Sequence, residues 1–233
     1  MNQELILVLD IGTSSVRSAL YDLDGNVLPE TFVKNERTLT ATDDGGAEID
    51  AEEAFEQIAK AIDDVLRKYK SNKNEIAYVA ASSFWHSLVG IDSKGKPTTK
   101  VFGWADTRSR EYVAELRKKL NETDIHNRTG ARFHSSFWPA KLLWLRKDFP
   151  KIFAKTDKWL SFSDFVMLKL CGRAVTSVSM ASATGVFDIG KCNWDNSLLK
   201  FVKIKKENLR QSNQNGGNNG DNRSEVRNKI QTV

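Results

Sequence analysis

The sequence predicts an α/β fold built around a mixed sheet, and three features of its N-terminal part indicate it. An apolar run, ELILVLDIG, begins at Glu4 and has the length of a buried strand. The segment SVRSALYDL follows, and Asp24-Gly25-Asn26 gives a hairpin turn signal before VLPETFV, so three antiparallel strands are expected. Residues 51–69 place apolar side chains on one face at helical spacing, which predicts an amphipathic helix.

Strands and helices alternate along the following residues. The expected strands lie near 76–82, 87–92 and 100–103. The expected helices lie near 107–120, 136–148, 162–171 and 195–202. Opening strands in hairpins, followed by this alternation, are typical of an α/β or mixed-sheet domain.

Composition limits the class of protein. A length of 233 residues with 40% hydrophobic residues can support one large domain or two small ones, and it excludes disorder over the whole chain. No apolar run approaches the roughly 18 residues of a membrane-spanning helix, so we expect a cytoplasmic protein. Two cysteines, Cys171 and Cys192, cannot make a disulfide framework or a four-ligand zinc site, and the three scattered histidines show no metal-ligand spacing.

The positive charge of the chain is concentrated near its C-terminus. Residues 200–233 contain eight basic and three acidic side chains, which accounts for the whole formal charge of +5. The run QSNQNGGNNG has no apolar residue, and no aromatic side chain lies among the charges to stack on a nucleic-acid base. We therefore expect a single domain over 1–209, a disordered tail over 210–233, and neither nucleic acid nor membrane as a partner.

The segment LDIGTSSVR, at 9–17, has the chemistry of a phosphate site. Asp10 comes at the carboxyl end of the first expected strand, and Gly12 allows a tight turn and the close approach of a ligand. Hydroxyl groups and a cation follow on Thr13, Ser14, Ser15 and Arg17. A carboxylate that positions hydrated Mg²⁺ beside hydroxyls and an arginine suits phosphoryl transfer. A polar hairpin turn with an incidental arginine is the alternative interpretation.

A second candidate phosphate loop is GIDSKGKP at 90–97, which has the G-x-x-x-x-G-K spacing of a Walker A motif. Pro97 stands where that motif requires serine or threonine, so the hydroxyl that would bind Mg²⁺ is missing. The following TTKVFGW has the pattern of a strand rather than a helix. Asp92-Ser93-Lys94-Gly95 is therefore predicted to form a β-turn.

Several motifs occur together in one order along the chain: DIGTSSVR, SSFWHSLVGID at 82–92, GWADTRS at 103–109, TGARFH and KLLWLR within 129–146, and SATGVFD at 182–188. Over residues 4–208 the sequence resembles the N-terminal domain of FGGY-family carbohydrate kinases, most closely gluconate kinases and next xylulose kinases. The resemblance implies a ribonuclease H-like fold of the actin/hexokinase type, whose two domains close over ATP and a sugar. It also implies a phosphotransferase that uses ATP and Mg²⁺, with a hydroxyl of a small-molecule sugar or sugar acid as the acceptor.

The resemblance assigns roles to residues at matching positions. Asp10 resembles the family's aspartate that positions magnesium and phosphate. The contacts to the ATP phosphates would come from Gly12, Thr13, Ser14, Ser15 and Arg17. Trp85 and His86 fall where related enzymes bind the sugar, with an aromatic face for its C–H groups and an imidazole for its hydroxyls.

Further candidates have alternative explanations. Trp104 and Asp106 are predicted sugar contacts, although a pair of Asp106 and Arg108 at the start of a helix could equally be a structural cap. Arg132, His134 or Lys141 could pair with the carboxylate of a sugar acid. The position of Lys141 on an amphipathic helix favours a solvated charge instead.

The chain departs from the family towards its C-terminus. The aspartate that acts as general base in full-length relatives follows a Gly-rich strand beyond the matching residues. Gly220-Asp221-Asn222 has no apolar strand before it, so we do not expect Asp221 to replace that base. We therefore expect an incomplete chain that lacks the base and the C-terminal domain and is inactive alone. A xylulose kinase domain, a non-catalytic sugar-binding fragment and an actin-like ATPase are the alternatives.

Overall fold

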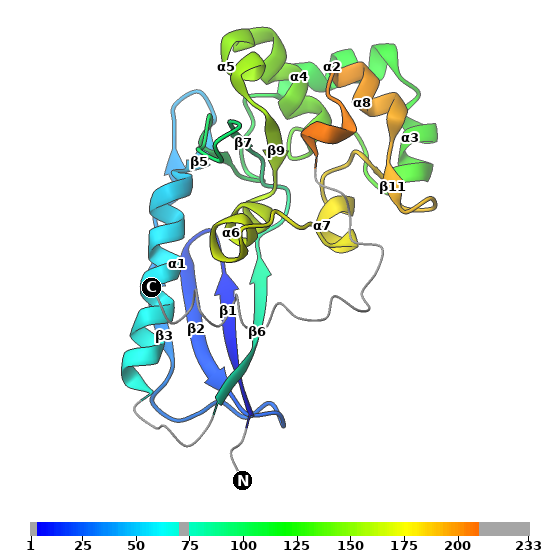
Figure 1. Cartoon of the computed structure of the whole chain (residues 1–233). Helices are drawn as coiled ribbons and strands as arrows, with labels where there is room; N and C mark the ends of the chain where they lie inside the picture. The colour runs from blue at the N-terminus through cyan, green and yellow to red at the C-terminus, as the bar shows by residue number, and fades with distance from the viewer. Residues whose placement is uncertain (1–3, 70–74, 210–233) are drawn as a thin grey trace. The chain divides into compact units, whose positions relative to one another are not determined.

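The computed structural model describes residues 4–69 and 75–209, and the chain divides into two compact units (Figure 1). The first unit contains the described residues of Met1–Leu39 and Glu52–Phe84. The second contains Thr40–Ala51 and the described residues from Trp85 on. No linker or shift in composition marks this division in the sequence. The predicted tail, with Asp221, lies outside the described residues.

A four-stranded sheet in the order β3-β2-β1-β6 forms the first unit together with one long helix. Its elements are β1 (Glu4–Ile11), β2 (Ser15–Tyr21), β3 (Val33–Glu36), α1 (Ala51–Lys68) and β6 (Glu75–Ser83). β1 pairs antiparallel with β2 and parallel with β6, so β6 lies at the edge of the sheet. The predicted opening strands and the predicted helix are thus present.

The core of the first unit lies between α1 and one face of the sheet (Figure 1). Side chains of β1 alternate between the two faces, and those on the core face are buried: Leu5, Leu7, Leu9 and Ile11. α1 buries a stripe at helical spacing, made of Ala54, Ile58, Ala61, Ile62 and Val65. Acidic residues in its first turn and basic residues in its last turn favour the helix, because they complement its dipole.

The third strand begins later than the sequence pattern predicts. The pattern predicts a strand over 27–33, but β3 starts where that segment ends. Pro29 has no N–H to donate to a strand ladder, and Glu30 has a φ of 65°, in the left-handed region. The N–H and the hydroxyl of Thr31 both donate to the carbonyl of Leu28, so this stretch is a turn.

The second unit contains short antiparallel strands and most of the helices. Its strands are β4 (Thr40–Ala41), β5 (Ala47–Ile49), β7 (Val89–Ile91), β8 (Val101–Phe102), β9 (Lys158–Leu160), β10 (Phe187–Asp188) and β11 (Asn193–Trp194). They pair in the orders β4-β5-β8, β7-β9 and β10-β11. Its helices are α2 (Arg110–Lys119), α3 (Glu122–Thr129), α4 (Trp138–Asp148), α5 (Pro150–Lys155), α6 (Phe162–Cys171), α7 (Val178–Ser182), α8 (Asn196–Val202) and the 3₁₀ helix η1 (Lys206–Asn208).

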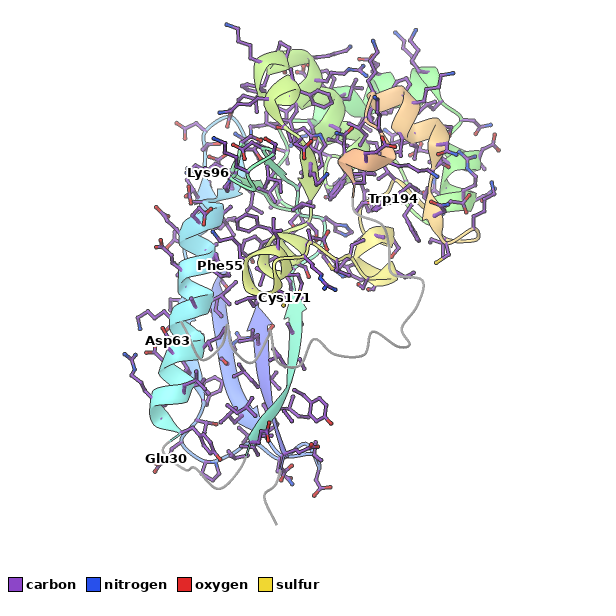
Figure 2. All side chains as sticks on the ribbon, viewed as in Figure 1. Glu30, Phe55, Asp63, Lys96, Cys171 and Trp194 are labelled. Carbon is purple, nitrogen blue, oxygen red and sulfur yellow. The ribbon has the colours of Figure 1, made fainter. Side chains whose placement is uncertain are left out.

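Helix α4 is enclosed by the second unit. Every residue from Trp138 to Leu145 is buried, so the helix has no exposed face over that length. The Trp138 indole N–H donates to the carbonyl of Ser87 at 2.8 Å. Trp194 of β11, labelled in Figure 2, packs edge to face on Phe187, with ring centroids 5.4 Å apart. All these apolar side chains belong to one continuous core cluster.

The predicted β-turn at 92–95 is confirmed. The N–H of Gly95 donates to the carbonyl of Asp92 at 2.9 Å, and Gly95 has a φ of 79°, which favours glycine. Cys171 and Cys192 are both partly buried. Within residues 4–69 and 75–209, no helix has the length and apolar character needed to cross a membrane.

Replacement of a core leucine tests the packing of the first unit. Leu7→Ala in β1 should lower the free energy of unfolding by about 2–5 kcal/mol, because it deletes buried methyl groups and leaves a cavity. The matched control is Leu23→Ala, since Leu23 is 60% exposed. It should change the free energy by less than about 0.5 kcal/mol. Denaturant titration followed by circular dichroism measures both, and equal effects would contradict the burial of β1.

Candidate functional site

The carboxylate of Asp10 lies near the end of β1 between a cation and a hydroxyl group. Arg17 Nη1 donates to Asp10 Oδ2 at 2.9 Å, and Ser82 Oγ donates to Oδ1 at 3.1 Å. The register places Arg17 of β2 and Ser82 of β6 directly beside Asp10. Both side chains of the ion pair are 48% exposed, so a ligand can reach them. An ion pair this exposed contributes little to the free energy of unfolding. A ligand can therefore replace this contact at little cost to the stability of the fold.

A tight turn joins β1 to β2 beside this carboxylate. The N–H of Gly12 donates to the carbonyl of Ser15 at 2.9 Å. A Cβ at Gly12 would lie 3.1 Å from that oxygen, so a larger residue would press against the turn. Ser14 is exposed and Thr13 is partly exposed, whereas Ser15 is only 3% exposed. The turn thus presents Thr13 and Ser14 to a ligand, and a contact from the Ser15 hydroxyl stays a prediction.

A buried arginine, Arg37, fixes this turn from within the first unit, and sequence reasoning missed it. Its guanidinium donates to the carbonyl of Gly12 at 3.1 Å, and its backbone N–H donates to the carbonyl of Ser14 at 2.8 Å. It also donates to Gln57 and to the carbonyl of Ala54, both on α1. Burial lowers the pKa of Arg37 to about 10. A single basic residue in NERTL carries no sequence signal for this role.

The donors around Asp10 fit a magnesium ion bound together with a nucleotide. Mg²⁺ keeps several waters in proteins and takes one or two carboxylates along with phosphate oxygens. Asp10 supplies one carboxylate, and Ser82 and the turn supply hydroxyl groups. No group of three or more His, Cys, Asp or Glu in residues 4–69 and 75–209 could hold a metal ion. An ion at Asp10 would therefore depend on the phosphates of its nucleotide.

His86, in the second unit, combines a strained backbone with a fixed ring. Its φ of 58° lies in the left-handed region, which non-glycine residues rarely adopt. Its Nδ1 lies 2.7 Å from the carbonyl oxygen of Ala183, and because a carbonyl only accepts, Nδ1 carries the proton. In the neutral ring Nε2 is then an acceptor, which suits a hydroxyl donor. Backbone strain of this kind clusters at functional sites.

Two aromatic rings pack edge to face on His86. The Phe137 ring lies 4.7 Å from it and the Trp85 ring 5.8 Å, measured between centroids. Trp85 is 49% exposed, so an indole surface lies beside an imidazole that can accept a hydrogen bond. This arrangement suits the C–H groups and hydroxyls of a polyol. The structure thus brings the predicted pair together and adds Phe137, which the sequence motif did not single out.

Asp106 is engaged in contacts within the second unit. It is 1% exposed, and its Oδ2 accepts from Arg108 at 2.5 Å and from the N–H of Ala47 at 3.1 Å. Arg108 also donates to Glu48 at 2.7 Å, so these side chains fasten β5 to the segment before α2. These contacts favour the structural alternative for Asp106. Trp104 is 54% exposed and stays a predicted sugar contact.

The expectation of a solvated Lys141 is wrong. The side chain is fully buried, because α4 is enclosed over this stretch and offers no exposed face. Its Nζ donates to the carbonyls of Ser135 at 2.6 Å and Ser136 at 2.9 Å. Burial lowers the pKa of Lys141 to about 7, and the nearby Asp106 carboxylate opposes part of that fall. Lys141 therefore fixes the segment before α4 and is not presented to a substrate carboxylate.

The segment that Lys141 fixes carries the other two candidate cations. Arg132 and His134 are both exposed. The Ser136 N–H donates to Nδ1 of His134 at 3.1 Å, and the Ser136 hydroxyl donates to the carbonyl of Trp104 at 2.9 Å. The chain of contacts from Lys141 through Ser136 thus orders the backbone at His134 and at Trp104. Arg132 and His134 remain available to an acidic ligand.

The chain is similar to several known proteins. A family model for the N-terminal domain of the FGGY family of carbohydrate kinases matches residues 5–229. Gluconokinase from Bacillus subtilis (strain 168) is 27% identical over 204 residues, which cover 88% of this chain and 39% of that protein.

Two solved structures are also similar. Gluconate kinase from Lactobacillus acidophilus has a TM-score of 0.88 and 29% identity, covering 99% of this chain and 46% of that one. Xylulose kinase from the same organism has a TM-score of 0.87 and 29% identity, covering 98% and 46%. The chain therefore spans less than half the length of these relatives. The comparisons confirm the predicted fold class.

A titration tests the buried amine of Lys141. Its folded pKa is about 7 and its ordinary value is 10.5, so between these pH values the unfolded chain binds more protons than the folded chain. The stability of the natural protein relative to Lys141→Met should therefore rise with pH from about 7 to about 10, by at most about 1.4 kcal/mol per pH unit.

Denaturant titrations across that pH range measure this difference. Lys147→Met is the matched control, since Lys147 lies on the same helix with a side chain that is 43% exposed. The control should show no such slope. A pH-independent difference between the natural protein and Lys141→Met would contradict the burial of the amine.

Proposed function

Because the chain belongs to the FGGY family of carbohydrate kinases, we propose that it is a domain of an ATP-dependent kinase that phosphorylates a hydroxyl of gluconate. The observation that carries the proposal is the group of Asp10, Arg17 and Ser82 beside the turn at Gly12. Phosphoryl transfer requires groups that position the phosphates and neutralise their charge. An exposed carboxylate next to a cation, hydroxyls and a tight turn meets this requirement.

Residues of the first unit would have separate roles in binding the phosphates. Asp10 would hold hydrated Mg²⁺, and the ion when bound would neutralise charge on the transferring phosphoryl group. Arg17 would donate to phosphate oxygens, together with the hydroxyls of Thr13 and Ser14. Arg37 acts on the turn itself, because it holds the carbonyls of the turn in place.

The residues of the second unit would bind the sugar. Trp85 would pack its exposed face on C–H groups, and Nε2 of His86 would accept a hydrogen bond from a hydroxyl. A sugar acid also needs a basic group near its carboxylate, and Arg132 and His134 are exposed basic side chains. These cations and the order of the sequence motifs support gluconate as the substrate.

Two alternatives keep specific support. The xylulose kinase from Lactobacillus acidophilus is as similar in sequence as the gluconate kinase, at 29% identity. A sugar-binding role without turnover is supported by the group at Trp85 and His86, which residues of the second unit form by themselves within the match to 39% of Bacillus subtilis gluconokinase. We propose that the general base and the adenine site come from the part of the kinase outside that match. A cytoplasmic location stays a prediction.

Equilibrium binding to the purified chain tests the substrate. Calorimetry should show tighter binding of gluconate than of xylulose. His86→Ala should weaken gluconate binding by about 1–3 kcal/mol, because a sugar hydroxyl loses its partner. His126→Ala on α3 is the control and should leave the affinity unchanged. Tighter binding of xylulose, or full gluconate affinity in His86→Ala, would contradict the assignment.

Turnover tests the role of Asp10. In a chimera of this chain with the unmatched part of Bacillus subtilis gluconokinase, Asp10→Asn should lower kcat by orders of magnitude. The KM for gluconate should change little, because the lost charge acts on magnesium and the phosphoryl group rather than on the sugar. Asp24→Asn, in the exposed turn after β2, should leave kcat unchanged. A chimera with Asp10→Asn that retains full kcat would remove the role given to this residue.

A further inference from the structure

The turn that follows α7 lies beside the imidazole of His86. It comprises residues 183–185, within the motif SATGVFD, and the N–H of Gly185 donates to the carbonyl of Ser182 at 3.3 Å. Gly185 has a φ of 75°, in the left-handed region that favours glycine. Each of the three residues of this turn contacts the group around His86.

The first two residues of the turn contribute their backbone carbonyls. The carbonyl of Ala183 accepts from Nδ1 of His86 at 2.7 Å, and the carbonyl of Thr184 accepts from the backbone N–H of Trp138 at 2.9 Å. Ala183 is the C-cap of α7, and a carbonyl at this end of a helix has no partner within the helix. The His86 ring therefore supplies the donor that this carbonyl needs.

Trp138 joins the same turn to the backbone that follows His86. Its indole N–H donates to the carbonyl of Ser87 at 2.8 Å. The Ser87 hydroxyl in turn accepts from the N–H of Phe162 at 3.0 Å. Trp138 and Ser87 are each 1% exposed, so loss of the indole N–H would leave a buried carbonyl without its donor. These hydrogen bonds hold the chain next to the left-handed residue.

Gly185, the third residue of the turn, lies against Phe137. A Cβ at Gly185 would be 3.1 Å from both Cβ and Cδ1 of Phe137, which is closer than an ordinary van der Waals contact. The Phe137 ring packs on the His86 ring, with the centroids 4.7 Å apart. The absence of a side chain at Gly185 therefore lets Phe137 contact the turn and the imidazole together.

We propose that the turn at 183–185 positions His86 for the sugar, with Gly185 and Trp138 as positioning residues that do not touch the ligand. The turn keeps the proton of the neutral ring on Nδ1, so Nε2 is left as an acceptor. The ligand group at Nε2 must then carry a proton, as a hydroxyl does and an ionised carboxylate does not. The inference rests on the proposed function, in which His86 binds the sugar.

The protonation of the two ring nitrogens tests the positioning without any sugar. Long-range ¹H–¹⁵N correlation spectra of the labelled full-length chain, at a pH where the ring is neutral, distinguish a protonated nitrogen from an unprotonated one. The chain has three histidines, and the spectrum of His86→Ala assigns the signals of this one. We expect the proton on Nδ1 in the natural chain and a mixture of both tautomers in Gly185→Ala.

Gly95→Ala is the matched control for the strain of an alanine with a positive φ. Gly95 has a φ of 79° and belongs to the same unit. A Cβ there would lie 3.8 Å from Leu168, at an ordinary contact distance. This control should keep the natural tautomer. A proton on Nε2 in the natural chain, or the natural tautomer in Gly185→Ala, would overturn the proposal.

Calorimetry with gluconate measures the effect on binding. Gly185→Ala should weaken the affinity by about tenfold, because a displaced contact group binds less well, while Gly95→Ala should bind as the natural chain does. If Gly185 acts through Phe137, the substitution should cost less in a chain that already carries Phe137→Leu. Full affinity in Gly185→Ala, or additive effects of the two substitutions, would contradict the proposal.

A second variant covers the case in which Gly185→Ala does not fold, which circular dichroism would show. Trp138→Phe removes the indole N–H that donates to Ser87. It should likewise mix the tautomers of His86 and weaken gluconate binding. If neither variant folds, the tautomer of the natural chain still decides the proposal.

The two measurements separate this inference from the proposed function. A natural chain that binds no gluconate, with a His86 tautomer that changes in Gly185→Ala, would contradict the proposed function and support the positioning role. Gluconate binding that depends on His86 but is the same in Gly185→Ala would support the proposed function and overturn the positioning role.

Discussion

The parallel pairing of β1 with β6 is the constraint on which the candidate phosphate site depends. A parallel pair needs a long crossover, and the segment with α1 supplies it. Because the two strands run in one direction, Asp10 and Ser82 reach the same end of the sheet, and the antiparallel strand β2 returns Arg17 to that end. Backbone ladders rather than loop contacts therefore set the positions of these three side chains. The same pairing leaves β6 at the edge, where its apolar residues remain exposed.

Both candidate sites are held in place by residues that lower the stability of the fold, either because they bury a charged group or because their backbone is strained. Arg37 is 6% exposed, and its hydrogen bonds to the turn and to α1 offset the desolvation of its charge. His86 has a left-handed backbone, which costs of order 1–3 kcal/mol, and contacts with Ala183 and Phe137 hold it there. Lys141 is buried with its amine on two backbone carbonyls of the segment before α4. These costs are explained if the turn after β1 and the ring of His86 must be in place before a ligand binds.

The sequence predicts the elements whose signals are local. The opening strands, the amphipathic α1 and the turn at 92–95 follow from apolar spacing and turn residues, and the ordered motifs indicate the family. The start of β3 is missed because the stretch with Pro29 and Glu30 forms a turn before the strand. The spacing of apolar residues does not indicate that turn. Burial of Lys141 depends on the enclosure of α4 by segments distant in the sequence. The residues of the helix itself therefore do not indicate that this side chain is buried. Arg37 is missed for a similar reason, since its partners lie on α1 and in the turn after β1.

We propose that the turn after β1 binds the phosphates of a magnesium-bound nucleotide. The most direct measurement is a titration of the isotope-labelled chain with ATP and Mg²⁺, followed by the backbone amide resonances. We expect saturable shifts concentrated at residues 12–17, which require Mg²⁺ and are lost in Asp10→Asn. Shifts that leave 12–17 unchanged, or that are the same in Asp10→Asn, would contradict it.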